Sequence, residues 1–127
     1  MKNLKPFAAL ALLATLTLNA LPLHATILTG APDLLPSAWM TDADGYIMVR
    51  ISNLGGDDAA SSLVRVRHFF KSEDVATGGT PAQAFGGQYI KTHIKLMPGW
   101  PVLVTADVTN VVSESDETNN YHAFSTR

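Results

Sequence analysis

The sequence predicts an all-β protein, an antiparallel sandwich of about seven strands, preceded by a short segment outside the fold. No window after residue 26 holds apolar residues at helical spacing, whereas several windows alternate apolar and polar residues as half-buried strands do. Turn-forming Gly, Asn, Asp and Pro residues separate these windows, a spacing typical of sandwiches. The 127 residues have room for one domain, and without cysteine that domain must be stabilised by packing.

The N-terminal segment has the layout of a secretory signal peptide. Lys2 and Lys5 form a basic head, residues 7–18 are an apolar run, and a small residue stands at Ala25. We expect residues 1–25 to be removed by cleavage after Ala25, with Ala20 as the other candidate site. The apolar run is shorter than the ~20 residues that a membrane-spanning helix needs. The sequence therefore predicts an exported protein without a membrane span, whose single domain covers residues 26–127.

The first predicted strands precede the long connection in the middle of the chain. Residues 33–39 form an extended segment that Pro36 confines to the edge of a sheet. In 46–52, Ile47, Val49 and Ile51 point to one face, and in 63–70 Val64 and Val66 do so. Residues 71–87 are the long connection, with room for a short extra edge strand.

The remaining strands follow that connection. Residues 88–96 place Ile90 and Ile94 opposite a polar row, residues 102–108 carry four small apolar side chains on one face, and residues 120–125 form the last strand. The alternating positions also predict the core, which comprises Val49, Ile51, Val64, Val66, Ile94, Val102 and Val104.

Charge and motifs exclude several classes of function. Nine basic and eleven acidic residues give a net charge of −2, with no clustered basic face for nucleic acid. The chain has no Gly-x-Ser-x-Gly elbow, no His-Glu-x-x-His helix and no phosphate-binding loop. We therefore expect a protein without enzymatic activity and without a nucleic-acid partner.

The C-terminal region is rich in oxygen-bearing side chains. Calcium binds six to eight oxygens in flexible geometry, so this composition permits a calcium site. The alternative is structural, because Asn and Asp side chains also lock turns by bonding to backbone groups. We expect the structural role and no cofactor, with calcium left as the alternative at Asp107, Asn110, Glu114, Asp116, Glu117 and Asn119.

Histidines and aromatic residues supply the other candidates. Copper could bind His68, His93 or His122 together with methionines, but no two of these histidines share a ligand spacing. Most of the aromatic residues, with Trp39, Phe70 and Trp100 among them, are core candidates. We expect Phe69 and Phe85 to face outward beside the long connection, where an exposed ring marks an interface.

The tail also carries a family resemblance. A strand, Asp107, a short turn, and then Glu114, Glu117, Asn119 and Asn120 resemble the end of the CARDB domain, a bacterial cell-adhesion-related module. Other turns agree with the family over residues 32–124, at Pro32-Asp33-Leu34, Asn53-Leu54-Gly55, Gly86-Gly87-Gln88 and Pro98-Gly99-Trp100. The chain departs from the family pattern at Pro101 and in the longer segment 71–85.

The resemblance implies an immunoglobulin-like sandwich that mediates binding or spacing outside the cytoplasm. We therefore expect a non-enzymatic protein-interaction or adhesion-type module of the bacterial periplasm or cell exterior. Its partner would be another protein or a cell-surface component. The alternative is a metal-binding accessory protein, with calcium at the acidic tail or copper at the histidines.

Overall fold

The computed structural model describes residues 30–127, apart from the side chains of residues 84–86. The predicted signal peptide, residues 1–25, lies outside the described residues. The described chain forms seven strands, β1 Leu34–Thr41, β2 Tyr46–Asn53, β3 Leu63–His68, β4 Lys71–Ala76, β5 Ala84–Lys95, β6 Val102–Thr105 and β7 Tyr121–Phe124.

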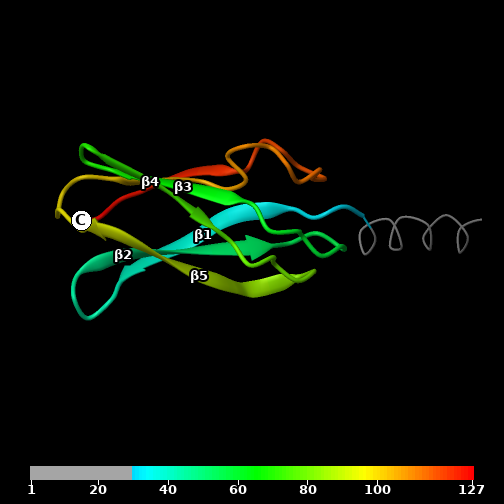
Figure 1. Ribbon diagram of the computed structural model, residues 1–127, viewed down its shortest axis with the longest axis horizontal. Coiled ribbons are helices and arrows are strands. Elements are labelled where there is room, and N and C mark those ends of the chain that lie inside the picture. The colour runs from blue at the N-terminus through cyan, green and yellow to red at the C-terminus, as the bar shows by residue number, and fades with distance from the viewer. Residues whose placement is uncertain (1–29) are drawn as a thin grey trace, which may run out of the picture. The chain divides into compact units, whose positions relative to one another are not determined.

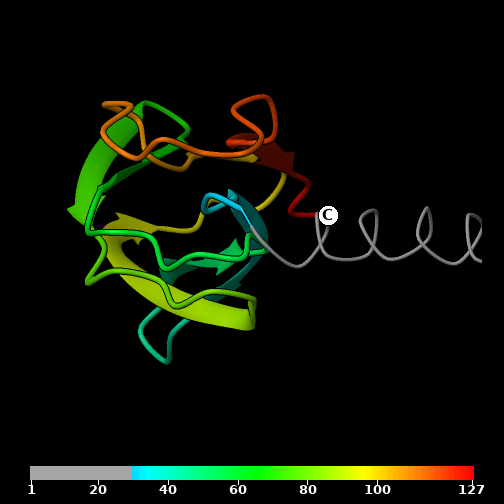
Figure 2. The same cartoon turned by 90° about the vertical axis from the view of Figure 1, so that its right-hand side faces the viewer.

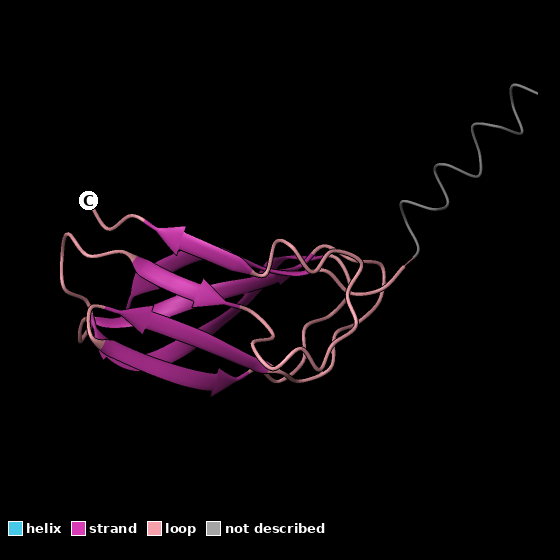
Figure 3. Ribbon diagram, turned by 90° about the horizontal axis from the view of Figure 1, so that it is seen from above, coloured by secondary structure: helices cyan, strands magenta, loops and turns pink. Residues whose placement is uncertain are grey.

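The seven strands form two antiparallel sheets packed face to face (Figures 1 and 2). One sheet has the order β1-β2-β5 and the other the order β4-β3-β6-β7. The expected edge position of the first strand is confirmed, and its register with β2 shifts between Pro36 and Ala38. Loops gather at the two ends of the sandwich, where functional residues of such folds commonly lie (Figure 3). The predicted immunoglobulin-like sandwich is therefore the observed fold.

The strand boundaries differ from expectation at three places. The strand predicted over 88–96 begins four residues earlier, at Ala84 of β5, within the segment predicted as a connection. The segment predicted as one strand over 63–70 ends at His68, and β3 and β4 form a hairpin around Phe69 and Phe70. The strand predicted over 102–108 ends at Thr105. Asp107 has a positive φ of 44°, which stops an extended chain. The extra edge strand expected within 71–87 is β4.

The core lies between the two sheets and consists mainly of β-branched residues. All seven residues predicted for the core are buried, and Trp39 packs against them. Two aromatic residues expected in the core are instead exposed, because Phe70 occupies a hairpin turn and Trp100 a loop. The core members among the described residues are Leu34, Ile47, Val49, Ile51, Ala59, Val64, Val66, Ile90, Ile94, Val102, Val104, Ala106 and Val112.

Asn53 connects the loops at the end of the sandwich where β1 begins. Its buried side chain accepts the N–H groups of Asp33 and Gly55, and donates to the carbonyl oxygens of Asp57 and Thr80. Gly55 must lack a side chain, since a Cβ there would lie 2.1 Å from the carbonyl oxygen of Ala31. The Asn-x-Gly sequence thus fixes this end of the fold.

No helix within residues 30–127 has the length and apolar character needed to cross a membrane.

Candidate interaction site

Three aromatic side chains gather at the opposite end of the sandwich from the start of β1. Phe69 and Phe70 occupy the β3–β4 turn, and Trp100 lies in the loop between β5 and β6. The ring centroids of Phe69 lie 4.2 Å from Phe70 and 4.7 Å from Trp100. We call these three residues the aromatic tip. Phe69 is 42% exposed, Trp100 48% and Phe70 86%, so the cluster projects into solvent.

The turn that carries the aromatic tip has an unfavourable backbone. Phe69 has a φ of 56°, a left-handed conformation that bulky residues rarely adopt. Two-residue hairpin turns place Gly, Asn or Asp at such positions, because those residues adopt positive φ at little cost. A strained conformation of this kind costs on the order of 1–3 kcal/mol and is often found at functional sites. The chain is therefore strained at the turn that exposes the two phenyl rings.

Buried His68 joins the two segments of the aromatic tip. Its Nδ1 lies 3.0 Å from the carbonyl oxygen of Pro101, and its Nε2 accepts the N–H of Met97 at 2.7 Å. These partners assign the proton to Nδ1, since Nε2 must be an acceptor. His68 therefore ties the loop carrying Trp100 to the end of β3, immediately before Phe69.

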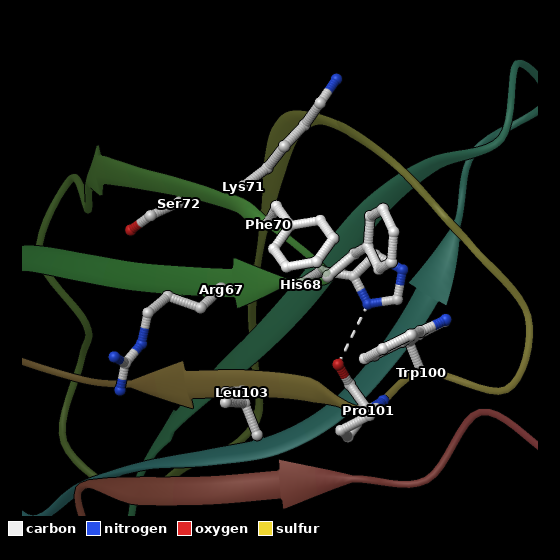
Figure 4. A pocket seen from close by; sticks show the side chains of 9 residues that line it. Arg67, His68, Phe70, Lys71, Ser72, Trp100, Pro101 and Leu103 are labelled. Atoms are coloured by element: carbon white, nitrogen blue, oxygen red, sulfur yellow. Dashed lines mark hydrogen bonds between the residues drawn. The ribbon is translucent and has the colours of Figure 1, made fainter.

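A hollow of about 400 Å³ lies beside the aromatic tip, over the outer face of β3 and β6. Figure 4 shows the rings of Phe70 and Trp100 near His68, and the side chain of Arg67 extending towards β6. Arg67 is exposed, and its side chain makes no hydrogen bond or ion pair within the described part of the chain. The residues lining the hollow are Arg67, His68, Phe69, Phe70, Lys71, Ser72, Trp100, Pro101 and Leu103.

The acidic side chains of the tail are engaged with neighbouring protein groups. Both carboxylate oxygens of buried Asp107 accept backbone N–H groups, from Val111 at 3.0 Å and Val112 at 2.9 Å. Asp116 accepts the N–H and hydroxyl of Thr118. These bonds lock the turn, which is the structural role expected for the acidic tail.

Glu114 and Glu117 accept hydrogen bonds from backbone N–H groups and from the side chain of Asn120. Glu114 accepts the N–H of Leu34 at 2.6 Å and the amide of Asn120 at 2.8 Å. Glu117 accepts the N–H of Glu114 at 3.0 Å and a longer bond from Asn120. The tail is thereby fastened to the start of β1.

The tail amides differ from the capping role expected of them. Asn119 donates to the carboxylate of Asp33 at 2.8 Å, and Asn120 donates to Glu114 and Glu117, so their partners are carboxylates and not backbone groups. Asn110, the remaining candidate ligand, is exposed and has a positive φ of 54°. Within residues 30–127, no group of three His, Asp or Glu side chains has a metal-binding arrangement.

Glu114 has a strongly shifted ionisation. Burial raises the pKa of its carboxyl to about 7, and the nearby charges of Glu117 and Asp107 act in the same direction. The hydrogen bonds from Leu34 and Asn120 favour the charged form and reduce this rise. Burial outweighs them, so Glu114 titrates near neutral pH.

The three histidines of the described residues lie apart in different environments. His68 is buried and hydrogen-bonded, as described above. His93 of β5 pairs with Glu73 of β4 at 2.9 Å, and the ring of His122 in β7 packs against Phe124. The structure therefore does not assemble them into the shared site that copper binding would require.

Of the three residues of the aromatic tip, the sequence predicted only Phe69 to be exposed. Phe69 is exposed, as expected, whereas the side chain of Phe85 lies outside the description. Phe70 and Trp100 were missed. The signals that could have found them are the end of alternation at His68, which leaves Phe69-Phe70 in a turn, and the Pro98-Gly99 turn before Trp100.

Fold and geometry together define an immunoglobulin-like β-sandwich with an exposed aromatic tip. The chain has the fold of a CARDB domain. It resembles the crystal structure of a CARDB domain from Pyrococcus furiosus in complex with di-metal ions, with a TM-score of 0.54 and 23% sequence identity, over 76% of this chain and 87% of that chain. At that identity the likeness concerns the fold alone. No protein-family model and no curated protein matches the sequence.

Proposed function

We propose that this protein is an exported, non-enzymatic interaction module of adhesion type, which binds a protein partner in the periplasm or outside the cell. The observation that carries the proposal is the aromatic tip, where three large rings are exposed on a strained turn. Aromatic side chains dominate the binding energy of protein interfaces, and exposed apolar clusters mark such surfaces.

Two further features support this proposal. The basic, apolar and small-residue pattern of residues 1–25 is that of an export signal. The fold is that of a CARDB domain, and the C-terminal motif resembles this bacterial cell-adhesion-related module. The aromatic tip offers rings to pack against, and the hollow beside it offers Arg67 to pair with, which suits binding rather than bond-making chemistry.

The proposal is tested by crosslinking in the cells that make the protein. A photoreactive phenylalanine replaces Phe70 in one variant and Val111 in another. Val111 is a matched control because it is 65% exposed but lies at the other end of the sandwich. We expect irradiation to join position 70, and not position 111, to one discrete protein, and we expect the protein in the periplasmic or extracellular fraction.

Equal crosslinking at both positions, or none at position 70, would contradict the assignment of the aromatic tip. Retention of the uncleaved chain in the cytoplasmic fraction would contradict the proposed export.

A further inference from the structure

We propose that the partner contacts this site through an acidic segment. In that segment an apolar or aromatic side chain is flanked by a carboxylate, and the carboxylate pairs with Arg67. This inference rests on the proposed function and adds the chemistry of the partner. The apolar side chain would enter the hollow beside the aromatic tip, and the carboxylate would meet the guanidinium on the adjoining strand face.

The first observation is the contrast between two arginines on the same face of β3. Arg65 is paired with Asp74 across the β3–β4 ladder, through two hydrogen bonds of 2.8 and 2.9 Å. Arg67 stands opposite Ser72, which is uncharged, and has Leu103 on its other side. Among the residues that the structure describes, the guanidinium of Arg67 therefore has its donors free for a carboxylate, which it binds best through two parallel bonds.

The second observation is the sign of the charge around the hollow. Its lining includes Arg67 and Lys71 but no carboxylate, and Lys71 extends away from the rings on the β4 side (Figure 4). The positive charge of this lining contrasts with the net negative charge of the rest of the described chain. All eleven acidic residues lie in the described part of the chain, whereas Lys2 and Lys5 do not, so this part is more negative than the chain's −2. Asp74 shares a neighbouring hollow with Arg67 but is already paired with Arg65. A hollow with a cationic lining on a negative domain favours an acidic ligand.

The third observation is the shape of the aromatic tip. The ring planes are tilted by 56° between Phe69 and Phe70 and by 71° between Phe69 and Trp100. Rings at such angles form a notch and not a flat stacking platform. The hollow of about 400 Å³ is at the small end of the usual ~300–1,000 Å³ range for ligand sites. This shape suits an inserted side chain with its flanking peptide.

An anionic membrane surface fits less well than an acidic peptide. The loop between β1 and β2 lies at the same end of the sandwich, since Tyr46 pairs with Lys95 next to the loop that carries Trp100. That loop exposes Asp44, and an anionic surface would repel its carboxylate. A peptide can contact Arg67 and the rings without approaching that loop.

The test is selection from a random peptide library displayed on phage, with the purified protein as bait. Four baits are compared, the parent, Phe70→Ser, Arg67→Gln and Arg65→Gln. We expect the parent and Arg65→Gln to enrich peptides with Asp or Glu next to a large apolar residue. Arg67→Gln should lose the preference for acid, and Phe70→Ser should lose the enrichment altogether.

A synthetic copy of an enriched peptide then tests the pairing directly. Replacing its acidic residue by the corresponding amide, or Arg67 by Gln, should each weaken binding about tenfold, the value of one charged hydrogen-bonded pair. Both changes together should weaken binding little more than either alone, because they remove the same contact.

The failures of the two proposals are distinguishable. Peptides that depend on Phe70 but show no acidic preference would overturn the acidic partner and leave the aromatic tip as the docking site. Unchanged enrichment on Phe70→Ser would overturn the site itself. No enrichment on the parent would overturn the acidic segment, with crosslinking at position 70 still deciding the docking site. Self-association or binding to phosphatidylglycerol vesicles, if either is lost in Phe70→Ser, would identify a second copy or a membrane as the occupant and likewise overturn the inference.

Discussion

Glu114 illustrates how a single side chain supports this fold and makes its stability sensitive to pH. Its carboxylate bridges the backbone of Leu34, at the start of β1, and the amide of Asn120, just before β7. The same position is partly buried and close to other carboxylates, which raises the pKa of Glu114 to about 7. The charged form therefore gains two hydrogen bonds but loses much of its hydration.

The raised pKa of Glu114 predicts that the folded protein is more stable in mild acid than in mild base. In the unfolded chain the pKa of this carboxyl is near its ordinary value of 4.5, so between about pH 4.5 and 7 the folded state binds more protons. This contribution is complete below pH 4.5 and is lost as the pH rises through about 7. Allowing for solvent screening, we expect a loss of the order of 1 kcal/mol, measured by urea unfolding at pH 5 and pH 8.

Glu114→Gln is the control, because the amide keeps the shape and cannot ionise. Asn120 can rotate its amide to suit the new side chain, since its Oδ1 has no partner. The difference in unfolding free energy between pH 5 and pH 8 should be smaller in this variant than in the parent. An equal difference in both proteins would show that Glu114 is not responsible.

Among the elements, the 106–120 segment is held by side chains rather than by a strand ladder. Ala106 donates its N–H to Asn120, and between them the chain turns on the carboxylates of Asp107, Glu114 and Glu117. These carboxylates are the same groups that a calcium site would use. Their oxygens already accept hydrogen bonds from protein groups at 2.6–3.3 Å, so calcium would have to replace those bonds.

We therefore predict that calcium does not stabilise the protein. A site with an affinity of ~10 µM would add about 2.7 kcal/mol at 1 mM calcium, which raises the melting midpoint of a domain of this size by about ten degrees or more. We expect 1 mM calcium to leave the midpoint unchanged, as measured by scanning calorimetry at pH 7.5. A rise in the parent that disappears in the Glu114→Gln, Glu117→Gln double variant would establish a calcium site.

At the scale of the whole molecule, the fold depends on one layer of side chains between the two sheets. Val66 lies at its centre, fully buried on β3 and in register with Val104 of β6. The side chains of alternate residues on β3 point to the outer face, where Arg65 stands in register with Thr105. A change on one face therefore affects the core, and a change on the other does not.

Val66→Asp places an unpaired charge in this layer, and we expect a loss of at least about 3 kcal/mol in unfolding free energy. Thr105→Asp is the matched control, because its carboxylate would lie on the outer face beside Arg65. The control should change stability by about 0.5 kcal/mol or less, in line with other surface substitutions. Thermal unfolding followed by circular dichroism measures both, and similar melting of the two variants would mean that the inward face is assigned wrongly.

The aromatic tip, finally, is where the sequence departs from the family it resembles. Pro101 is one of those departures, and its carbonyl oxygen is the partner of His68. The other is the segment 71–85, which begins with β4 directly after the Phe69-Phe70 turn. Trp100 itself lies in a turn that agrees with the family, so the aromatic tip combines a shared turn with neighbouring segments in which this chain departs from the family pattern.

The sequence by itself determined the strands, the edge position of β1 and the core, because alternation and turn residues are local signals that a two-layer fold must satisfy. It could not determine which aromatic residues are exposed or what the acidic tail contacts. Phe70 is exposed because β3 and β4 pair in a register that leaves it in the turn. The carboxylate of Glu114 accepts a hydrogen bond from the N–H of Leu34, because that residue, eighty positions earlier, lies beside it. The first fact depends on the register of a local hairpin and the second on contact between segments eighty residues apart, and only the three-dimensional structure fixes both.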